Sequence, residues 1–125
     1  MVNARRWPAG ALLAAALTVW AAGQAGLTVR LGAHPFWARE VPLMGLVLAV
    51  PIALVGFWRP GLPGSLALVC LIAGAVSARL GKAAFAASYA ENALAGQFWF
   101  FGWIVLSGGA VALIAVGLAR LRPRA

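Results

Sequence analysis

Acidic residues are almost missing from this sequence, which has no aspartate and only two glutamates, Glu40 and Glu91. Without aspartate there is no Ser-His-Asp set, and no glycine-rich phosphate loop ending in Lys-Ser or Lys-Thr is present. The chain also has one histidine, His34, and one cysteine, Cys70. One of each is too few for the three or four ligands of a metal site, and a lone cysteine cannot form an internal disulfide. We therefore expect a protein that is not an enzyme, with no cofactor and no metal.

Basic residues are in excess, since ten Lys and Arg against two acids give a net charge of +8. In a soluble protein this excess would favour nucleic-acid binding. Here the arginines flank apolar segments and form no contiguous patch. We therefore assign them to membrane orientation and to anionic lipid headgroups on the cytoplasmic side, and we expect no nucleic-acid partner.

Apolar residues dominate the composition, at 64% of the 125 residues, with a mean hydropathy of +0.95. A soluble domain is about half apolar. The stretch from Gln97 to Leu118 has no charged residue and would be roughly 33 Å long as a helix, enough to cross a bilayer core. Three further stretches resemble it. The prediction is a single domain over residues 1–125, an all-α integral membrane protein built as an antiparallel four-helix transmembrane bundle, with helices at about 7–28, 41–58, 65–82 and 97–119.

Small residues recur at every fourth position of the first predicted helix, at Gly10, Ala14, Thr18, Ala22 and Gly26. Such a stripe lets two helices approach closely in lipid. It favours packing within the chain, and the alternative is the seam of a homodimer. Two further sets indicate the same kind of packing: Cys70, Gly74 and Ala78, and the pair Gly108-Gly109.

Pro51 lies in the middle of the second predicted helix. A proline there removes one backbone hydrogen bond and predicts a kink. The kink has either a packing role alone or marks a flexible, cavity-lining position, so Pro51 is a candidate hinge.

Orientation follows from the distribution of basic residues. Four spans place both termini on the side of the second loop, with six arginines: Arg5, Arg6, Arg59, Arg120, Arg122 and Arg124. The opposite side has four basic residues and both glutamates. This bias favours cytoplasmic termini, and the Arg- and Ala-rich composition favours a bacterial inner membrane. The first apolar stretch is longer than a usual signal core, so we favour a retained anchor helix over a cleaved signal peptide.

The remaining polar residues gather on the outer side of the predicted bundle. They form a candidate cluster of Arg79, Lys82, Glu91, Asn92, Gln24 and Gln97. One interpretation is a mouth that holds a lipid headgroup or a small anion, with Arg79 and Lys82 as cationic ligands. The alternative is ordinary loop charges.

Three functions remain open. The chain has several rows of small residues suited to helix packing and few polar residues within the predicted helices. This favours a non-enzymatic accessory or structural subunit, which packs against a larger membrane protein or against itself. The Pro51 kink and the outer cations favour a small oligomeric transporter or a lipid-handling protein instead. A membrane enzyme acting through Glu91, Tyr89 or His34 would require those side chains to converge in one pocket.

Overall fold

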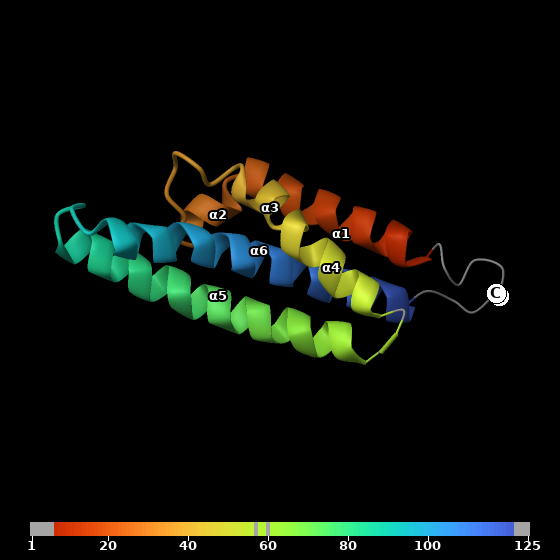
Figure 1. Ribbon diagram of the computed structural model, residues 1–125. Helices are drawn as coiled ribbons and strands as arrows, with labels where there is room; N and C mark the ends of the chain where they lie inside the picture. The colour runs from red at the N-terminus through yellow and green to blue at the C-terminus, as the bar shows by residue number, and fades with distance from the viewer. Residues whose placement is uncertain (1–6, 57, 60, 122–125) are drawn as a thin grey trace.

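The computed structural model describes residues 7–56, 58–59 and 61–121, and this part of the chain is helical and contains no strand (Figure 1). The six helices are α1 (Trp7–Gln24), α2 (Leu27–Arg30), α3 (Val41–Met44), α4 (Leu46–Val55), α5 (Leu62–Ala87) and α6 (Ala93–Leu121). The all-helical prediction is therefore confirmed for the described residues.

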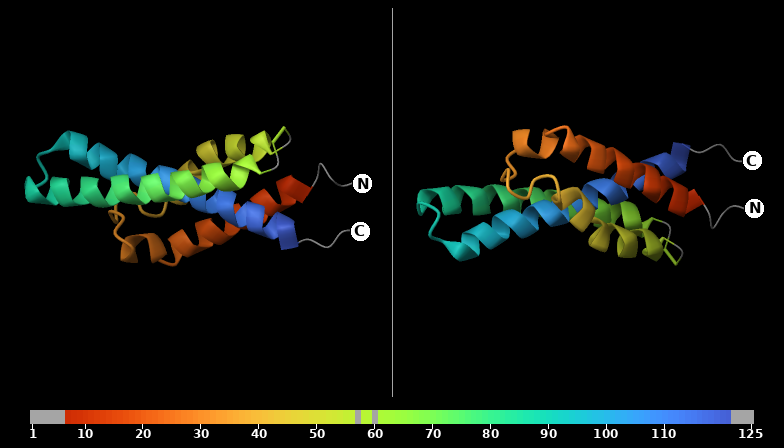
Figure 2. Two further views of the ribbon diagram at one scale, coloured as in Figure 1. Left: turned by 90° about the horizontal axis from the view of Figure 1, so that it is seen from below. Right: turned by 90° about the horizontal axis from the view of Figure 1, so that it is seen from above.

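Helices α5 and α6 are both long and apolar enough to cross a membrane. They have 26 and 29 residues and are longer than the predicted ranges 65–82 and 97–119. Only 22% of the most apolar stretch of α5 and 44% of that of α6 are buried, so neither resembles the enclosed core helix of a soluble protein. They form an antiparallel hairpin whose turn extends beyond the rest of the molecule (Figures 1 and 2).

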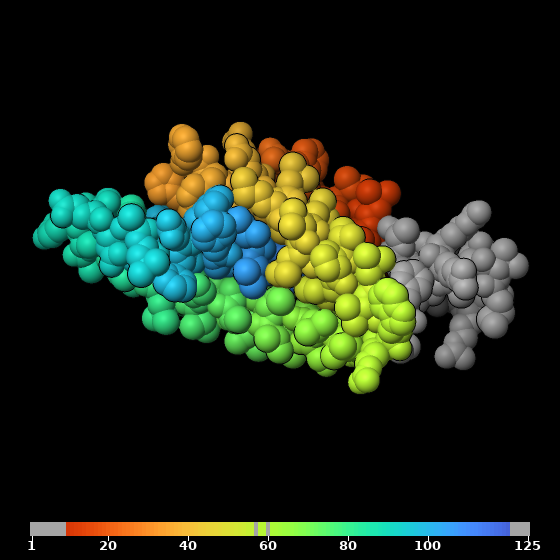
Figure 3. Space-filling view, viewed as in Figure 1, coloured from red at the N-terminus to blue at the C-terminus, as the bar shows by residue number. Residues whose placement is uncertain are grey.

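Helix α6 is the centre of the fold, because it contacts α1, α3, α4 and α5 (Figure 1). Its Val111, Ala112 and Ser107 are almost completely buried. From the side shown in Figure 3, the yellow segment of α3 and α4 covers the middle of the molecule, whereas the hairpin turn projects uncovered. The apolar stretch that the sequence marks as a span is thus the helix on which the others pack.

The first of the two shorter predicted spans is divided in two. It is interrupted after Gln24, where Gly26 adopts a left-handed conformation with φ 93° that glycine accepts at little cost. The second is helical from Val41 to Val55, because Gly45 between α3 and α4 keeps a helical backbone with φ −61° and ψ −22°. The continuous helix over 7–28 is therefore corrected to α1 with α2, and the end of the helix predicted over 41–58 is corrected to Val55.

Glycines allow the backbones of α5 and α6 to touch. A Cβ atom on Gly102 would lie 2.5 Å from the backbone nitrogen of Ala78, and one on Gly109 would lie 2.6 Å from that of Leu71. A Cβ on Gly74 would collide with the backbone of Leu106. The predicted close packing at Gly74, Ala78 and Gly109 is confirmed.

The small-residue stripe of α1 does not pack as expected. Gly10, Ala14 and Thr18 are exposed, while Ala15 is fully buried in a core that also contains Val111. The sequence holds a second row of period four, one residue along, and that row includes Ala15 and Gly23 and faces the protein. Packing within the chain is thus the wrong interpretation for Gly10, Ala14 and Thr18.

The connections lie at two opposite ends of the molecule (Figure 2). The start of α1, the end of α6, and the segment between α4 and α5 are at one end, which we call the Trp7 end. Residues 31–40 and the turn between α5 and α6 are at the other, which we call the His34 end.

Candidate functional site

Residues 31–40 lie against α6 at the His34 end and bring together aromatic rings from three parts of the chain. The loop supplies His34 and Trp37, α5 supplies Phe85, and α6 supplies Trp99 and Phe100. The rings of Trp37 and Trp99 are 5.5 Å apart at 74°, and those of Trp37 and Phe100 are 5.1 Å apart at 66°. These are edge-to-face contacts, which stabilise aromatic pairs beyond the area that they bury.

Trp99 holds the loop in place. The residue is 8% exposed, and its Nε1–H donates a hydrogen bond to the carbonyl oxygen of Gly32 at 3.0 Å. Gly81 of α5 makes room for this arrangement, since a Cβ there would lie 2.5 Å from the Trp99 backbone nitrogen. The Thr28 hydroxyl donates to the carbonyl of Ala38 at 2.8 Å and ties the two ends of the loop together.

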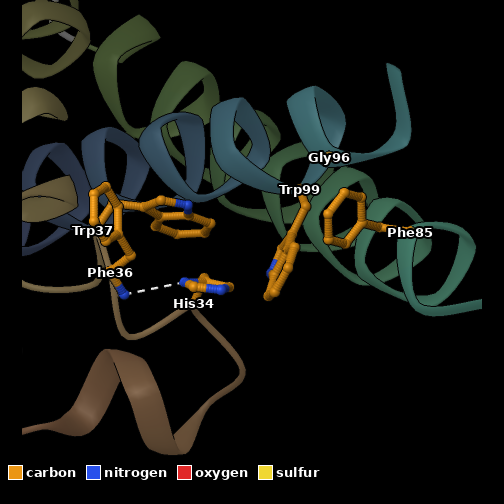
Figure 4. A pocket seen from close by; sticks show the side chains of 6 residues that line it. All are labelled: His34, Phe36, Trp37, Phe85, Gly96 and Trp99. Atoms are coloured by element: carbon orange, nitrogen blue, oxygen red, sulfur yellow. Dashed lines mark hydrogen bonds between the residues drawn. The ribbon is translucent and has the colours of Figure 1, made fainter. Parts of the chain in front are cut away.

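An open cavity of about 200 Å³ lies between the loop and the hairpin. Its walls consist of aromatic side chains, apart from one glycine; they are His34, Phe36, Trp37, Phe85, Gly96 and Trp99 (Figure 4). His34 lies between Trp37 and Trp99 in Figure 4, with Phe85 beyond Trp99. The centroid of its ring is 5.4 Å from that of Trp99 and 6.1 Å from that of Trp37.

One nitrogen of His34 is already used. Nδ1 accepts a hydrogen bond from the backbone N–H of Phe36 at 3.0 Å, drawn as the dashed line in Figure 4. In a neutral imidazole the accepting nitrogen carries no proton, so the proton is on Nε2. His34 therefore offers one N–H donor beside the cavity.

Lys82 is the one predicted polar residue that reaches this aromatic group. Its Nζ lies 5.9 Å from the centroid of the Trp99 ring, a cation–π contact. A Cβ on Gly32, which has φ 116°, would lie 3.4 Å from the same Nζ. The side chain thus lies along the loop and closes one side of Trp99.

The other predicted site residues have separate positions. Gln24 Nε2 donates to the carbonyl of Arg39 at 3.4 Å, which links the end of α1 to the loop before α3. Asn92 caps α6, since its Oδ1 accepts the backbone N–H of Ala95 at 3.1 Å. Arg79 on α5, Glu91 in the hairpin turn and Gln97 on α6 are all exposed.

The enzyme hypothesis required Glu91, Tyr89 and His34 to share one pocket. Tyr89 is 92% exposed in the hairpin turn, and neither it nor Glu91 lines the cavity beside His34. Among the described residues no group of three or more His, Cys, Asp or Glu side chains gathers as a metal site would require.

Sequence reasoning missed the aromatic cavity and two glycines of the α5–α6 contact, Gly81 and Gly102. The sequence does not predict that Phe36-Trp37 and the aromatic run from Phe98 come together, because nothing in their spacing shows that residues 31–40 fold back on α6. Gly81 and Gly102 were detectable: each lies seven residues from another small residue of the seam, at Gly74 and Gly109 respectively. A period of seven marks one helix face.

No protein-family model, curated protein or solved structure matches this chain.

Proposed function

We propose that this chain is a four-span protein of a bacterial inner membrane, in which α1, α3 with α4, α5 and α6 all cross the bilayer. Support comes from large apolar side chains exposed on each of these segments. Leu13 of α1, Val47 of α4, Val69 of α5 and Phe101 of α6 are all more than half exposed. In water this surface would be costly, whereas in lipid it costs nothing.

The positions of the charged residues along α5 agree with the thickness of a bilayer. From Leu62 to Lys82 the helix rises roughly 30 Å at 1.5 Å per residue, which is about the thickness of a hydrocarbon core. Arg79 and Lys82 then lie near one interface, where long side chains reach the headgroups. The last turn of α5 and the hairpin turn with Glu91 extend into water.

The short spans fit as well. Helix α1 has 18 residues and α4 has 10, and α3 adds one turn to the latter. Segments shorter than the core are accommodated by local thinning of the bilayer and by flanking anchors. Arg30 and Arg39 flank these segments at the His34 end, as Arg59 flanks α4 at the other. The distribution of arginines supports a cytoplasmic Trp7 end.

Within this membrane protein the proposed role is that of a non-enzymatic accessory or structural subunit. The observation that carries this proposal is the exposed face of α1, where Gly10, Ala14 and Thr18 are not covered by any other part of the chain that the structure describes. A helix face of this composition is suited to close contact with another helix. The partner is a larger membrane protein or a second copy.

The test is purification of the protein at native expression level in nanodiscs or a gentle detergent, followed by mass photometry and mass spectrometry. We expect a stoichiometric membrane partner, and we expect Arg79→Ala and Glu91→Ala variants to retain it because both side chains are exposed. A monomer that purifies without a protein partner and without bound lipid would contradict the proposal.

A second candidate is the small oligomeric transporter or lipid-handling protein with an outer cationic mouth. The open cavity beside Lys82 favours it. A homo-oligomer without other proteins, whose transport or lipid binding is lost in Arg79→Ala or Lys82→Ala, would favour this candidate over the first.

A further inference from the structure

We propose that the aromatic cavity at the His34 end binds the head of a quinone, a flat, uncharged, carbonyl-bearing ring carried by a membrane-soluble molecule. This inference rests on the membrane placement above and adds a ligand to it. The site consists of His34 as the hydrogen-bond donor and the rings of Trp37, Trp99 and Phe85 as walls (Figure 4).

His34 supplies the hydrogen-bond donor of the proposed site. Nδ1 of His34 is held by the Phe36 N–H at 3.0 Å, which fixes the ring and leaves the Nε2–H for a ligand. Two wall residues also carry an indole N–H: that of Trp99 is used on the Gly32 carbonyl, and Trp37 carries a second. Of the two remaining ring donors, the Nε2–H of His34 is the one whose ring is fixed by a hydrogen bond to the loop, and it suits a ligand with a carbonyl oxygen at the edge of its ring.

The walls select a flat group. Trp37 and Trp99 contact each other edge to face at 74°, and His34 packs against both. A ligand ring therefore contacts the ring surface that this packing leaves open, and aromatic contacts of this kind are favourable. Phe85 adds a third surface, with its ring 5.7 Å from that of Trp99. Gly96 permits this position, because a Cβ there would lie 3.1 Å from the Phe85 ring.

Charge excludes the two other groups that such a site attracts. Aromatic cages bind ammonium groups through their ring faces, but Lys82 already lies over Trp99 and would repel a second cation. A phosphate requires several donors or cations, and no Lys or Arg lines the cavity. An uncharged aromatic ring is not repelled by Lys82 and does not require several cations for binding.

Size and position agree with a head group. The cavity of about 200 Å³ is smaller than the roughly 300–1,000 Å³ of pockets that enclose a whole drug-sized ligand. The cavity is also open, so that the apolar tail of a quinone can extend out of it. It lies at the height of Gly81 and Lys82, which the proposed placement puts at the boundary between hydrocarbon and headgroups.

Photolabelling with a short-chain azidoquinone tests this proposal in the purified, detergent-solubilised full chain. Trypsin cleaves after Arg30 and Arg39 and releases residues 31–39 as one peptide that contains three of the six wall residues. We expect label on this peptide and on the region around Trp99, and we expect an excess of unlabelled short-chain quinone to remove it. Label spread evenly over the lipid-facing residues of α5 would overturn the proposal.

The informative variant is His34→Asn. An asparagine oxygen at this position accepts the Phe36 N–H in place of Nδ1, which keeps the loop turn, whereas the amide N–H2 of asparagine lies closer to the backbone than Nε2 and does not reach the position of the ring donor. We expect apparent affinity for the quinone to fall about tenfold, the equivalent of one lost hydrogen bond. Trp58→Phe, which changes an exposed tryptophan outside the cavity, should not alter labelling.

Each outcome separates the two proposals. Unchanged binding in His34→Asn, or a phospholipid instead of a quinone retained by the loop peptide, contradicts the quinone site and leaves the membrane subunit standing. Specific labelling of a protein that fractionates away from membranes would contradict the membrane placement alone, because a short-chain quinone reaches the cavity from water.

Discussion

At the scale of single residues, the fold depends on positions that have no side chain. Gly74, Gly102 and Gly109 bring the backbones of α5 and α6 into contact, and Gly45 does the same for α6 and the α3–α4 segment, since its Cβ would lie 2.6 Å from the nitrogen of Gly108. Backbone atoms cannot rotate away as a side chain can. Adding one methyl group at such a position must separate two helices.

The pair Gly109→Ala and Gly117→Ala tests this dependence within one helix. At Gly109 the new Cβ would lie 2.6 Å from the Leu71 nitrogen and 2.8 Å from the Ala67 oxygen, whereas at Gly117 nothing lies within 4 Å. We expect Gly109→Ala to lower the free energy of unfolding by about 1–3 kcal/mol. Gly117→Ala should leave it unchanged or raise it by up to about 1 kcal/mol, through helix propensity.

The measurement is SDS titration of the detergent-solubilised protein, followed by circular dichroism. Equal effects of the two variants would mean that α5 and α6 are not in backbone contact.

The candidate site also shows what residue patterns can and cannot predict. The sequence identified Lys82 as a possible ligand residue and Asn92 as polar, but it did not indicate that one contacts Trp99 and the other caps α6. Those contacts depend on how residues 31–40 fold back, which is decided by a tertiary hydrogen bond from Trp99 to Gly32. Periodicity within one segment carries no information about such a contact.

At the scale of helices, the second predicted span stays helical through the residue at which the sequence suggested a kink. Helix α4 runs from Leu46 through Pro51 to Val55, and Gly45 before it has helical backbone angles as well. Pro51 is exposed, so its ring lies away from the packed face. The close contact with Gly108 fixes Gly45, whereas Pro51 is free of such a constraint.

Replacing Pro51 with alanine therefore tests whether it is a hinge or a tolerated interruption. Alanine would restore the backbone hydrogen bond to residue 47, and the expected result is a gain of about 1–3 kcal/mol in the free energy of unfolding. Gly45→Ala is the matched control and should destabilise the fold. A Pro51→Ala variant that unfolds more easily, or that loses its partner while gaining stability, would instead support a hinge.

At the scale of the whole molecule, the all-helical class and the two long apolar helices α5 and α6 were predictable, and helix ends were not. Charge-free apolar runs separated by arginines and Pro-Gly turns are strong local signals. The interruption at Gly26 is a left-handed backbone conformation of φ 93°, which a glycine within an apolar run permits but does not by itself indicate. The exposed face of α1 was likewise not predictable, because two adjacent rows of small residues have the same period and only packing distinguishes them.

The four-span placement predicts opposite accessibility at the two ends of the molecule. With Cys70 replaced by alanine, we expect Phe36→Cys and Glu91→Cys to react with a membrane-impermeant maleimide in intact cells. Arg59→Cys should react only after lysis. All three substituted residues are exposed, so burial in the protein does not limit the reaction.

The chain with its native Cys70, which is partly buried within α5, is the unreactive control. If Phe36→Cys and Arg59→Cys become accessible together while Glu91→Cys reacts separately, only the α5–α6 hairpin crosses the membrane.

The central position of α6 has a consequence for biosynthesis. This helix contacts α1, α3, α4 and α5, yet the ribosome makes it after all of them. Each of these four helices must therefore wait without its main partner until residues 93–121 have been translated. A nonsense or frameshift mutation that removes α6 would leave the other segments complete in sequence but unassembled, and we expect quality-control proteases to degrade them.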